Sequence, residues 1–252
     1  DAGGALGFEW AGRDDRVLFR FDLSNPVVSA GLDLVTSWAD RYYDSGASPV
    51  LPAAILILVT NPLDAMTYLV WRLSRFPKER VIGMAGLLDS ARLRTFVAQR
   101  LKVSVSQVQA LVLGGHGDSM VALARYTTVS GKPLPELLPP ADIQQLIQRT
   151  REGGAELVKL LKTGSAFYAP ASSAADMVQA ILKDEHRVLP CCAYLTGQFG
   201  LKDLFCGVPI RLGAKGVEEI VEVPLTAEEK AALAASARGV RQEMEAIDAL
   251  LK

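Results

Sequence analysis

The sequence has few of the residues that mark metal-binding or disulfide-rich proteins. Among its 252 residues are two histidines and three cysteines. Cys191, Cys192 and Cys206 do not have the spacing of paired zinc ligands and are too few for a disulfide framework, so no metal site is predicted. We expect the cysteines to be small core residues of a reduced, cytoplasmic protein.

Charge of one sign and long apolar runs are also scarce. The net charge is −1, with 27 basic and 28 acidic residues, which argues against nucleic-acid and anionic-membrane partners. The longest apolar run, residues 53–59, is far shorter than the roughly 20 residues of a membrane helix. The first residues lack the pattern of a signal peptide. Half of the residues are hydrophobic, which suffices for a sizeable core.

Residues 1–54 differ from the rest of the chain because they contain no Lys, Ile, Met, Gln, Cys or His. Short apolar pieces such as residues 17–21 occur without a clear strand order. Two hypotheses account for this composition: translation in a wrong reading frame, or a divergent segment that covers a sheet edge. Without a neighbouring strand, residues 53–59 would expose an apolar edge, which predicts poor solubility or obligate association.

From residue 53 onward, predicted strands and helices alternate. Residues 53–59 (AAILILV) are typical of a strand that is buried on both faces. Asn61 is a good helix cap and Pro62 a good first helical residue, so a helix is predicted over 62–74. Further strands are expected at 80–83 and 108–113, with a helix at 90–101. This alternation predicts an α/β fold with a Rossmann-type parallel sheet, here truncated.

The second half of the chain has a different pattern, which predicts an α+β unit. Helices are expected over 141–161, with a weak point at its paired glycines, and over 172–183. Strands of an antiparallel unit are expected at 187–196, 204–212 and 216–223. A capping box at Thr226 and Glu229 predicts a final helix over 226–252.

The chemistry-bearing residues gather around one glycine-rich loop. His116 follows a predicted strand, and such loops form the ligand crevice of open α/β sheets, so it is a candidate acid/base. The alternative is a turn histidine without a chemical role; His186, in a charged connection, is assigned none. The i, i+3 spacing of Asp89 and Arg92 places them on one face of a helix. They could form a surface ion pair, or Asp89 could orient His116 while Arg92 binds a substrate carboxylate. Asn61, a strand-end amide, could also contact a ligand.

Five motifs together resemble the lactate/malate dehydrogenase superfamily, and most closely its bacterial malate dehydrogenases of lactate-dehydrogenase-like type. They are residues 59–64 (VTNPLD), 86–92 (GLLDSAR), 114–118 (GGHGD), 162–166 (KTGSA) and 194–200 (YLTGQFG). The resemblance covers about four-fifths of the chain, from residue 53 to residue 252. It implies NAD-dependent conversion of malate to oxaloacetate and NADH, and a homo-oligomer, either a dimer or a tetramer.

The resemblance also implies roles for single residues. His116 matches the catalytic proton donor and acceptor, and Asp89 its carboxylate partner. Arg92 matches the arginine that binds the substrate's C1 carboxylate. Asn61 matches the residue that touches substrate and nicotinamide, with Val59 and Thr60 beside it in the cofactor-contact segment. Ala166 stands where lactate enzymes usually carry threonine, which favours malate over lactate.

The sequence departs from the family at its start. Gly3 to Gly7 lacks the spacing of the phosphate-binding GxGxxG turn and follows no predicted strand, so a flexible terminus is expected there. The mobile substrate loop with two arginines is not found before Asn61. We therefore expect residues 1–83 to be a partial, degenerate NAD-binding domain and residues 84–252 the catalytic domain. Two alternatives stay open: a lactate dehydrogenase, and a non-catalytic remnant or interaction partner that binds no cofactor.

Overall fold

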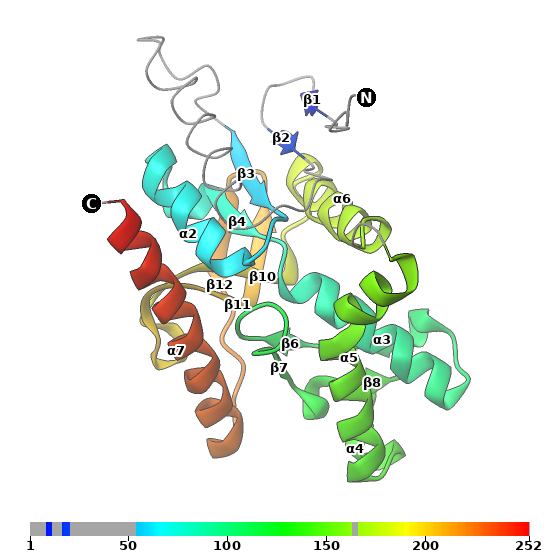
Figure 1. The fold of residues 1–252 in the computed structure, drawn as a ribbon. Helices are drawn as coiled ribbons and strands as arrows, with labels where there is room; N and C mark the ends of the chain where they lie inside the picture. Colours follow the sequence, from blue (N-terminus) through cyan, green and yellow to red (C-terminus); the bar gives the residue numbers. More distant parts are fainter. Residues whose placement is uncertain (1–8, 12–16, 21–53, 163–165, 252) are drawn as a thin grey trace.

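The computed structural model describes residues 9–11, 17–20, 54–162 and 166–251 (Figure 1). The glycine-rich residues 3–7, most of residues 1–54 and positions 163–165 of the KTGSA motif lie outside these ranges, as do the predictions made for them.

The fold is α/β and is built on one mixed sheet with the strand order β1-β2-β3-β4-β10-β11-β12. Strands β2, β3 and β4 are parallel, and every other neighbouring pair is antiparallel. The strands are β1 (Glu9–Ala11), β2 (Val17–Arg20), β3 (Ile55–Leu58), β4 (Val81–Gly83), β10 (Arg187–Thr196), β11 (Lys202–Gly213) and β12 (Gly216–Ile220). A parallel sheet and an antiparallel unit, both expected from the sequence, are therefore confirmed, and Gly83 pairs with Cys192 where they join.

The apolar strand β3 is paired on both sides. Val17 of β2 pairs with Ile55, and Val81 of β4 pairs with Leu56. Because β2 continues the ladder, the exposed edge expected for this strand is wrong. Ile55 is fully buried, as its continuous apolar sequence predicts.

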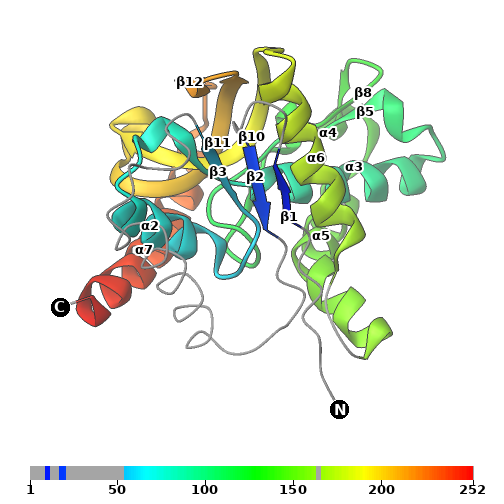
Figure 2. The same ribbon diagram turned by 90° about the horizontal axis from the view of Figure 1, so that it is seen from above.

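The helices cover the sheet and a smaller neighbouring unit. Helices α2 and α7 lie side by side on one side of the sheet, and α6 lies on the other (Figures 1 and 2). The capping box of α7 is confirmed: the Thr226 hydroxyl accepts from the Glu229 N–H at 3.2 Å, and Glu229 Oε2 accepts from the Thr226 N–H at 2.8 Å. The helices are α2 (Leu63–Ser74), α3 (Gly86–Leu101), α4 (Leu134–Leu137), α5 (Pro140–Leu161), α6 (Tyr168–Leu182) and α7 (Ala227–Leu250).

Two local predictions are wrong. Asn61 is not a helix cap, because α2 begins after Pro62, whose side chain cannot cap it. Residues 108–113 do not form one strand: β5 (Val108–Gln109) pairs with β8 (Thr128–Val129), and β6 (Val112–Leu113) with β7 (Val121–Ala122). Their backbone groups therefore find partners in two small sheets instead of the main one.

Two helices also begin earlier than predicted. Helix α3 starts at Gly86 instead of residue 90, and α6 at Tyr168 instead of residue 172. Helix boundaries are the least certain feature of any pattern, but the shift in α3 places Asp89 inside the first turn.

One large core lies between the sheet and helices α2, α6 and α7, and a second lies between α3 and α5. Cys191, Cys192 and Cys206 are free thiols that are fully buried in the first, which confirms their place as core residues. Within the described ranges, no helix is long and apolar enough to cross a membrane.

Candidate active site

The site centres on a buried carboxylate–imidazole pair. Asp89 stands in the first turn of α3, and its Oδ2 lies 2.8 Å from His116 Nδ1. The side chains are 2% and 12% exposed, respectively. This geometry lets Nδ1–H donate to the carboxylate, which leaves Nε2 as the nitrogen that can exchange a proton with a ligand.

The loop that carries His116 is fixed at three points by groups distant in sequence. The His116 N–H donates to Asp64 Oδ2 at 2.8 Å, and the Gly115 N–H donates to Ser236 Oγ at 2.8 Å. Gly114 bridges to Gly207 of β11, so close that a side chain at Gly207 would collide with the Gly114 carbonyl oxygen. Helices α2 and α7 and the main sheet therefore all hold this loop in place.

Arg92 completes the cluster from the same helix as Asp89. Its NH1 lies 3.6 Å from Asp89 Oδ1, which confirms that the two residues share a face of α3. The expected weak point at Gly153 and Gly154 is instead an unbroken stretch of α5. A Cβ built at Gly153 would lie 3.1 Å from Arg92 Cδ, so the glycine leaves room for the arginine side chain.

The electrostatics of the cluster favour a protonated imidazole. Burial lowers the pKa of His116, but the hydrogen bond and charge of Asp89, with the charge of Asp64, outweigh it and raise the pKa above the usual 6.5. Burial lowers the pKa of Arg92, and the charge of Asp89 opposes this. The cluster can thus hold and release one proton next to a cation.

The segment predicted to contact the cofactor lies at the carboxyl end of β3. Val59 is half-buried, and Thr60 and Asn61 are exposed, so their polar groups are accessible to a ligand. Asp64, a few residues further along, is the link from this segment to His116. The structure thus brings together His116, Asp89 and Arg92, and Asn61 precedes by three residues the Asp64 that binds the His116 N–H.

Two residues of the site escaped sequence reasoning. Asp64 stands in the VTNPLD motif, but its sequence position does not show that it reaches a loop 52 residues away. Ser236 lies in the middle of α7, and no pattern in the sequence distinguishes it from other small helical residues.

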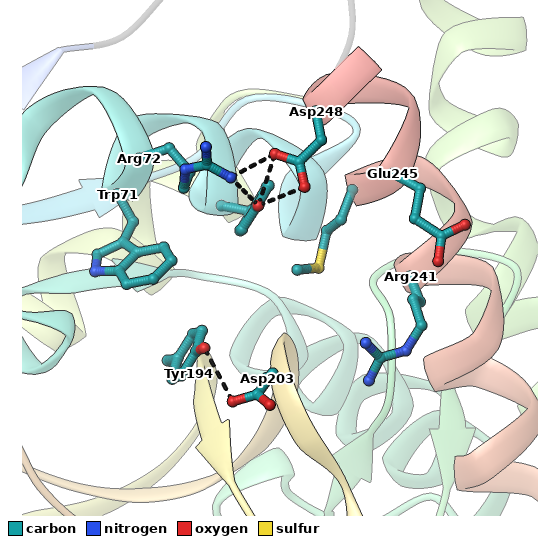
Figure 3. A pocket seen from close by; sticks show the side chains of 9 residues that line it. Trp71, Arg72, Tyr194, Asp203, Arg241, Glu245 and Asp248 are labelled. Carbon is teal, nitrogen blue, oxygen red and sulfur yellow. Dashed lines mark hydrogen bonds and ion pairs between the residues drawn. The ribbon is translucent and has the colours of Figure 1, made fainter. Parts of the chain in front are cut away.

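A cavity of about 410 Å³ lies elsewhere, between α2, α7 and the β10–β11 hairpin (Figure 3). Its polar groups largely bind one another: Tyr68 donates to Asp248, Arg72 pairs with the same carboxylate, and Tyr194 donates to Asp203 at 3.3 Å. None of its lining residues belongs to the His116 cluster. The contacts of Tyr68 and Arg72 with Asp248 join α2 to α7.

The second histidine lies in an exposed cluster. His186 Nδ1 is 2.7 Å from Glu218 Oε2, and Asp184 lies on the other side of the ring. These three residues form the only group of potential metal ligands within the described ranges. All three are exposed, and the histidine is already engaged by both carboxylates, so no metal is assigned here.

Comparison with known proteins identifies the family. Residues 87–251 match the family described as lactate/malate dehydrogenase, alpha/beta C-terminal domain. The chain belongs to the lactate/malate dehydrogenase family. Its sequence is 60% identical over 190 residues to a malate dehydrogenase of Synechocystis, covering 75% of this chain and 59% of that protein. The chain thus spans less than two thirds of the length of this relative.

Solved structures of the family superpose on the fold. Malate dehydrogenase from Salinibacter ruber is 50% identical, with a TM-score of 0.81 over 86% of this chain and 70% of that one. Malate dehydrogenase from Plasmodium falciparum, in complex with NADH, is 35% identical, with a TM-score of 0.85 over 95% of this chain and 78% of that one. The fold expected from the motifs is therefore confirmed.

Proposed function

We propose that the chain carries the catalytic site of an NAD-dependent malate dehydrogenase. The observation that carries the proposal is the buried Asp89–His116 pair with Arg92 beside it. A proton-exchanging imidazole next to a fixed guanidinium suits the oxidation of a 2-hydroxy acid, whose hydroxyl loses a proton while its carboxylate needs a cation.

Each residue has a defined task in this proposal. Nε2 of a neutral His116 accepts the hydroxyl proton of malate, and the imidazolium returns it when oxaloacetate is reduced. Asp89 holds the ring through Nδ1 and stabilises the imidazolium. Arg92 holds the C1 carboxylate, and Asn61 orients the substrate by its exposed amide. These roles place substrate and base in fixed geometry before reaction.

The end of β3 fits the nicotinamide portion of NAD. Thr60 and Asn61 offer exposed polar groups there, and Val59 offers a half-buried apolar surface. When bound, the nicotinamide would supply the hydride acceptor for C2 of malate. Residues 3–7, which lack the spacing of the phosphate-binding turn, lie outside the described residues, so the proposal rests on the nicotinamide end of the site.

Malate is proposed over lactate as the substrate. Ala166 is a small, half-buried residue, which leaves more space than the threonine usual in lactate enzymes. We also retain residues 1–83 as a partial cofactor domain, residues 84–252 as the catalytic domain, and a cytoplasmic location, as proposals.

We further propose that the chain forms a homo-oligomer through the end of α5 and the start of α6. Leu160 is 70% exposed, Phe167 46% and Tyr168 82%. The Phe167 and Tyr168 rings lie 4.5 Å apart, and large apolar side chains exposed at the surface are typical of an interface.

The first experiment is a titration of NADH into the purified chain, followed by nicotinamide fluorescence and then by NADH oxidation with oxaloacetate or pyruvate. The proposal expects saturable binding and a higher kcat/KM for oxaloacetate. His116→Asn should keep NADH binding and lower kcat by about 10²–10⁴-fold. Absence of NADH binding would support the non-catalytic alternative, and a preference for pyruvate would support a lactate dehydrogenase.

A further inference from the structure

Asp64 is a buried acid that the proposed reaction does not use. It lies in the first turn of α2, and only 3% of its surface is exposed. An acid near a helix N-terminus is ordinarily explained by the helix dipole. Such an acid is usually at the surface, however, and burying a carboxylate this completely is costly unless it serves a partner.

The partner of Asp64 is the loop of the proposed base. Its Oδ2 accepts from the His116 N–H at 2.8 Å. A Cβ built at Gly115 would lie 3.5 Å from the same oxygen, so the loop backbone packs directly on the carboxylate. Asp64 thus contacts the main chain at His116, while Asp89 contacts the ring of the same residue.

We propose that Asp64 is a positioning residue for His116: its carboxylate holds the backbone of the loop and places a second buried negative charge beside the imidazole. The inference deepens the proposed function, because it assigns to His116 two carboxylate partners in place of one. Asp89 sets the orientation and tautomer of the ring, and Asp64 sets the position of the main chain.

The charges around this carboxylate decide how it acts on His116. Burial raises the pKa of Asp64. Hydrogen bonding to the Cys192 thiol and to the His116 N–H lowers it, and so does the charge of His116. The charge of Asp89 raises it. Burial raises the pKa of Glu243 of α7, and the charge of Asp64 raises it further. The charge of Asp64 in turn raises the pKa of His116, and that of Arg92 lowers it.

The test is an NMR titration of the imidazole, which requires neither cofactor nor substrate. The chain has only two histidines, so a His186→Gln background leaves the His116 signal alone. Asp64→Asn keeps an oxygen that can accept from the His116 N–H but removes the charge. We expect it to lower the protonation constant of His116 by roughly three- to tenfold, as for loss of a nearby opposite charge.

Asp118→Asn is the matched control, because Asp118 is an exposed acid of the same loop and is absent from the charges that act on the His116 pKa. It should change the protonation constant much less. Asp64→Ala should lower that constant as Asp64→Asn does and also speed exchange of the His116 amide proton. A protonation constant unchanged in Asp64→Asn would overturn the proposal.

A measurement on the wild-type chain covers the case in which the variants do not fold. The side-chain carboxyl carbon of Asp64 should show a titration step at the same pH as the His116 ring, and its absence would also overturn the proposal. An inactive chain that shows these shifts would contradict the proposed function but not the role of Asp64. An active chain without these shifts would contradict the role of Asp64 but not the proposed function.

Discussion

The two adjacent glycines of α5 allow a sharp test of how Arg92 is held. Both lie inside the helix, and neither has a positive φ, so alanine suits the backbone at both positions. Gly-to-Ala changes in a helix interior stabilise by roughly 0.5–1 kcal/mol. The two substitutions should therefore give equal gains unless a neighbour interferes.

Arg92 is the neighbour at both positions, but it lies closer to Gly153 than to Gly154. At Gly154 the added methyl would lie 3.8 Å from the Arg92 guanidinium, an ordinary contact. At Gly153 it would lie 3.1 Å from Arg92 Cδ and 3.4 Å from Nε, so the arginine must shift by a few tenths of an ångström. Arg92 is held by Asp89 and is largely buried, so this crowding should cost about 1–3 kcal/mol, the usual range for overpacking.

The assay compares thermal unfolding of the wild-type chain with the Gly153→Ala and Gly154→Ala variants. Gly154→Ala should raise Tm by about 1–4 °C, from its propensity gain and the temperature scale of a domain of this size. Gly153→Ala should leave Tm unchanged or lower it, should move the Arg92 Nε–H resonance and should raise KM for oxaloacetate. Equal gains in Tm with an unmoved Arg92 resonance would refute the reasoning.

Three further predictions concern stability and assembly. Thr226→Ala removes the side-chain cap of α7 and should reduce the free energy of unfolding by about 0.5–2 kcal/mol in urea titrations, whereas Thr226→Ser should be near neutral. The pKa of His116 is raised in the folded chain, so its stabilisation is complete below about pH 6.5 and is lost as pH rises through the folded value. Urea titrations should show this fall above about pH 6.5, and Asp89→Asn should flatten it. Leu160→Lys and Tyr168→Lys should lower the sedimentation coefficient if the end of α5 forms the interface, while Lys159→Glu should change it less.

The sequence predicted most of the elements whose pattern is local. The run at 53–59 became β3, and the strand at 187–196 matches β10 in both bounds, because apolar side chains in extended runs have one stable place between packed layers. The capping box at Thr226 needed only residues three apart. In each case the information lies within a few residues of the element.

Where the sequence failed, the deciding partner was distant. Residues 108–113 have the composition of one strand, but Leu111 accepts from Leu123 and the Val112 N–H donates to the Ser90 hydroxyl, so the segment divides between two small sheets. No periodicity encodes such pairings. The exposed edge expected for β3 failed for the same reason, since its partner β2 comes from a segment whose composition showed no strand order.

The same difference between local and distant information applies to the site, where the sequence predicted the role of Asp89 but not that of Asp64. Asp89 was predicted because it stands one helical turn from Arg92 and because its motif, residues 86–92, matches the family's carboxylate partner of the catalytic histidine. Asp64 stands in an equally recognisable motif, yet a sequence pattern shows only that the first turn of a helix favours an acid there. Its burial and its hydrogen bond to the His116 main chain exist only once α2 packs against the glycine-rich loop. A residue that binds the backbone of a distant residue has no characteristic sequence spacing from it. Positioning residues of this kind are therefore identified from tertiary contacts.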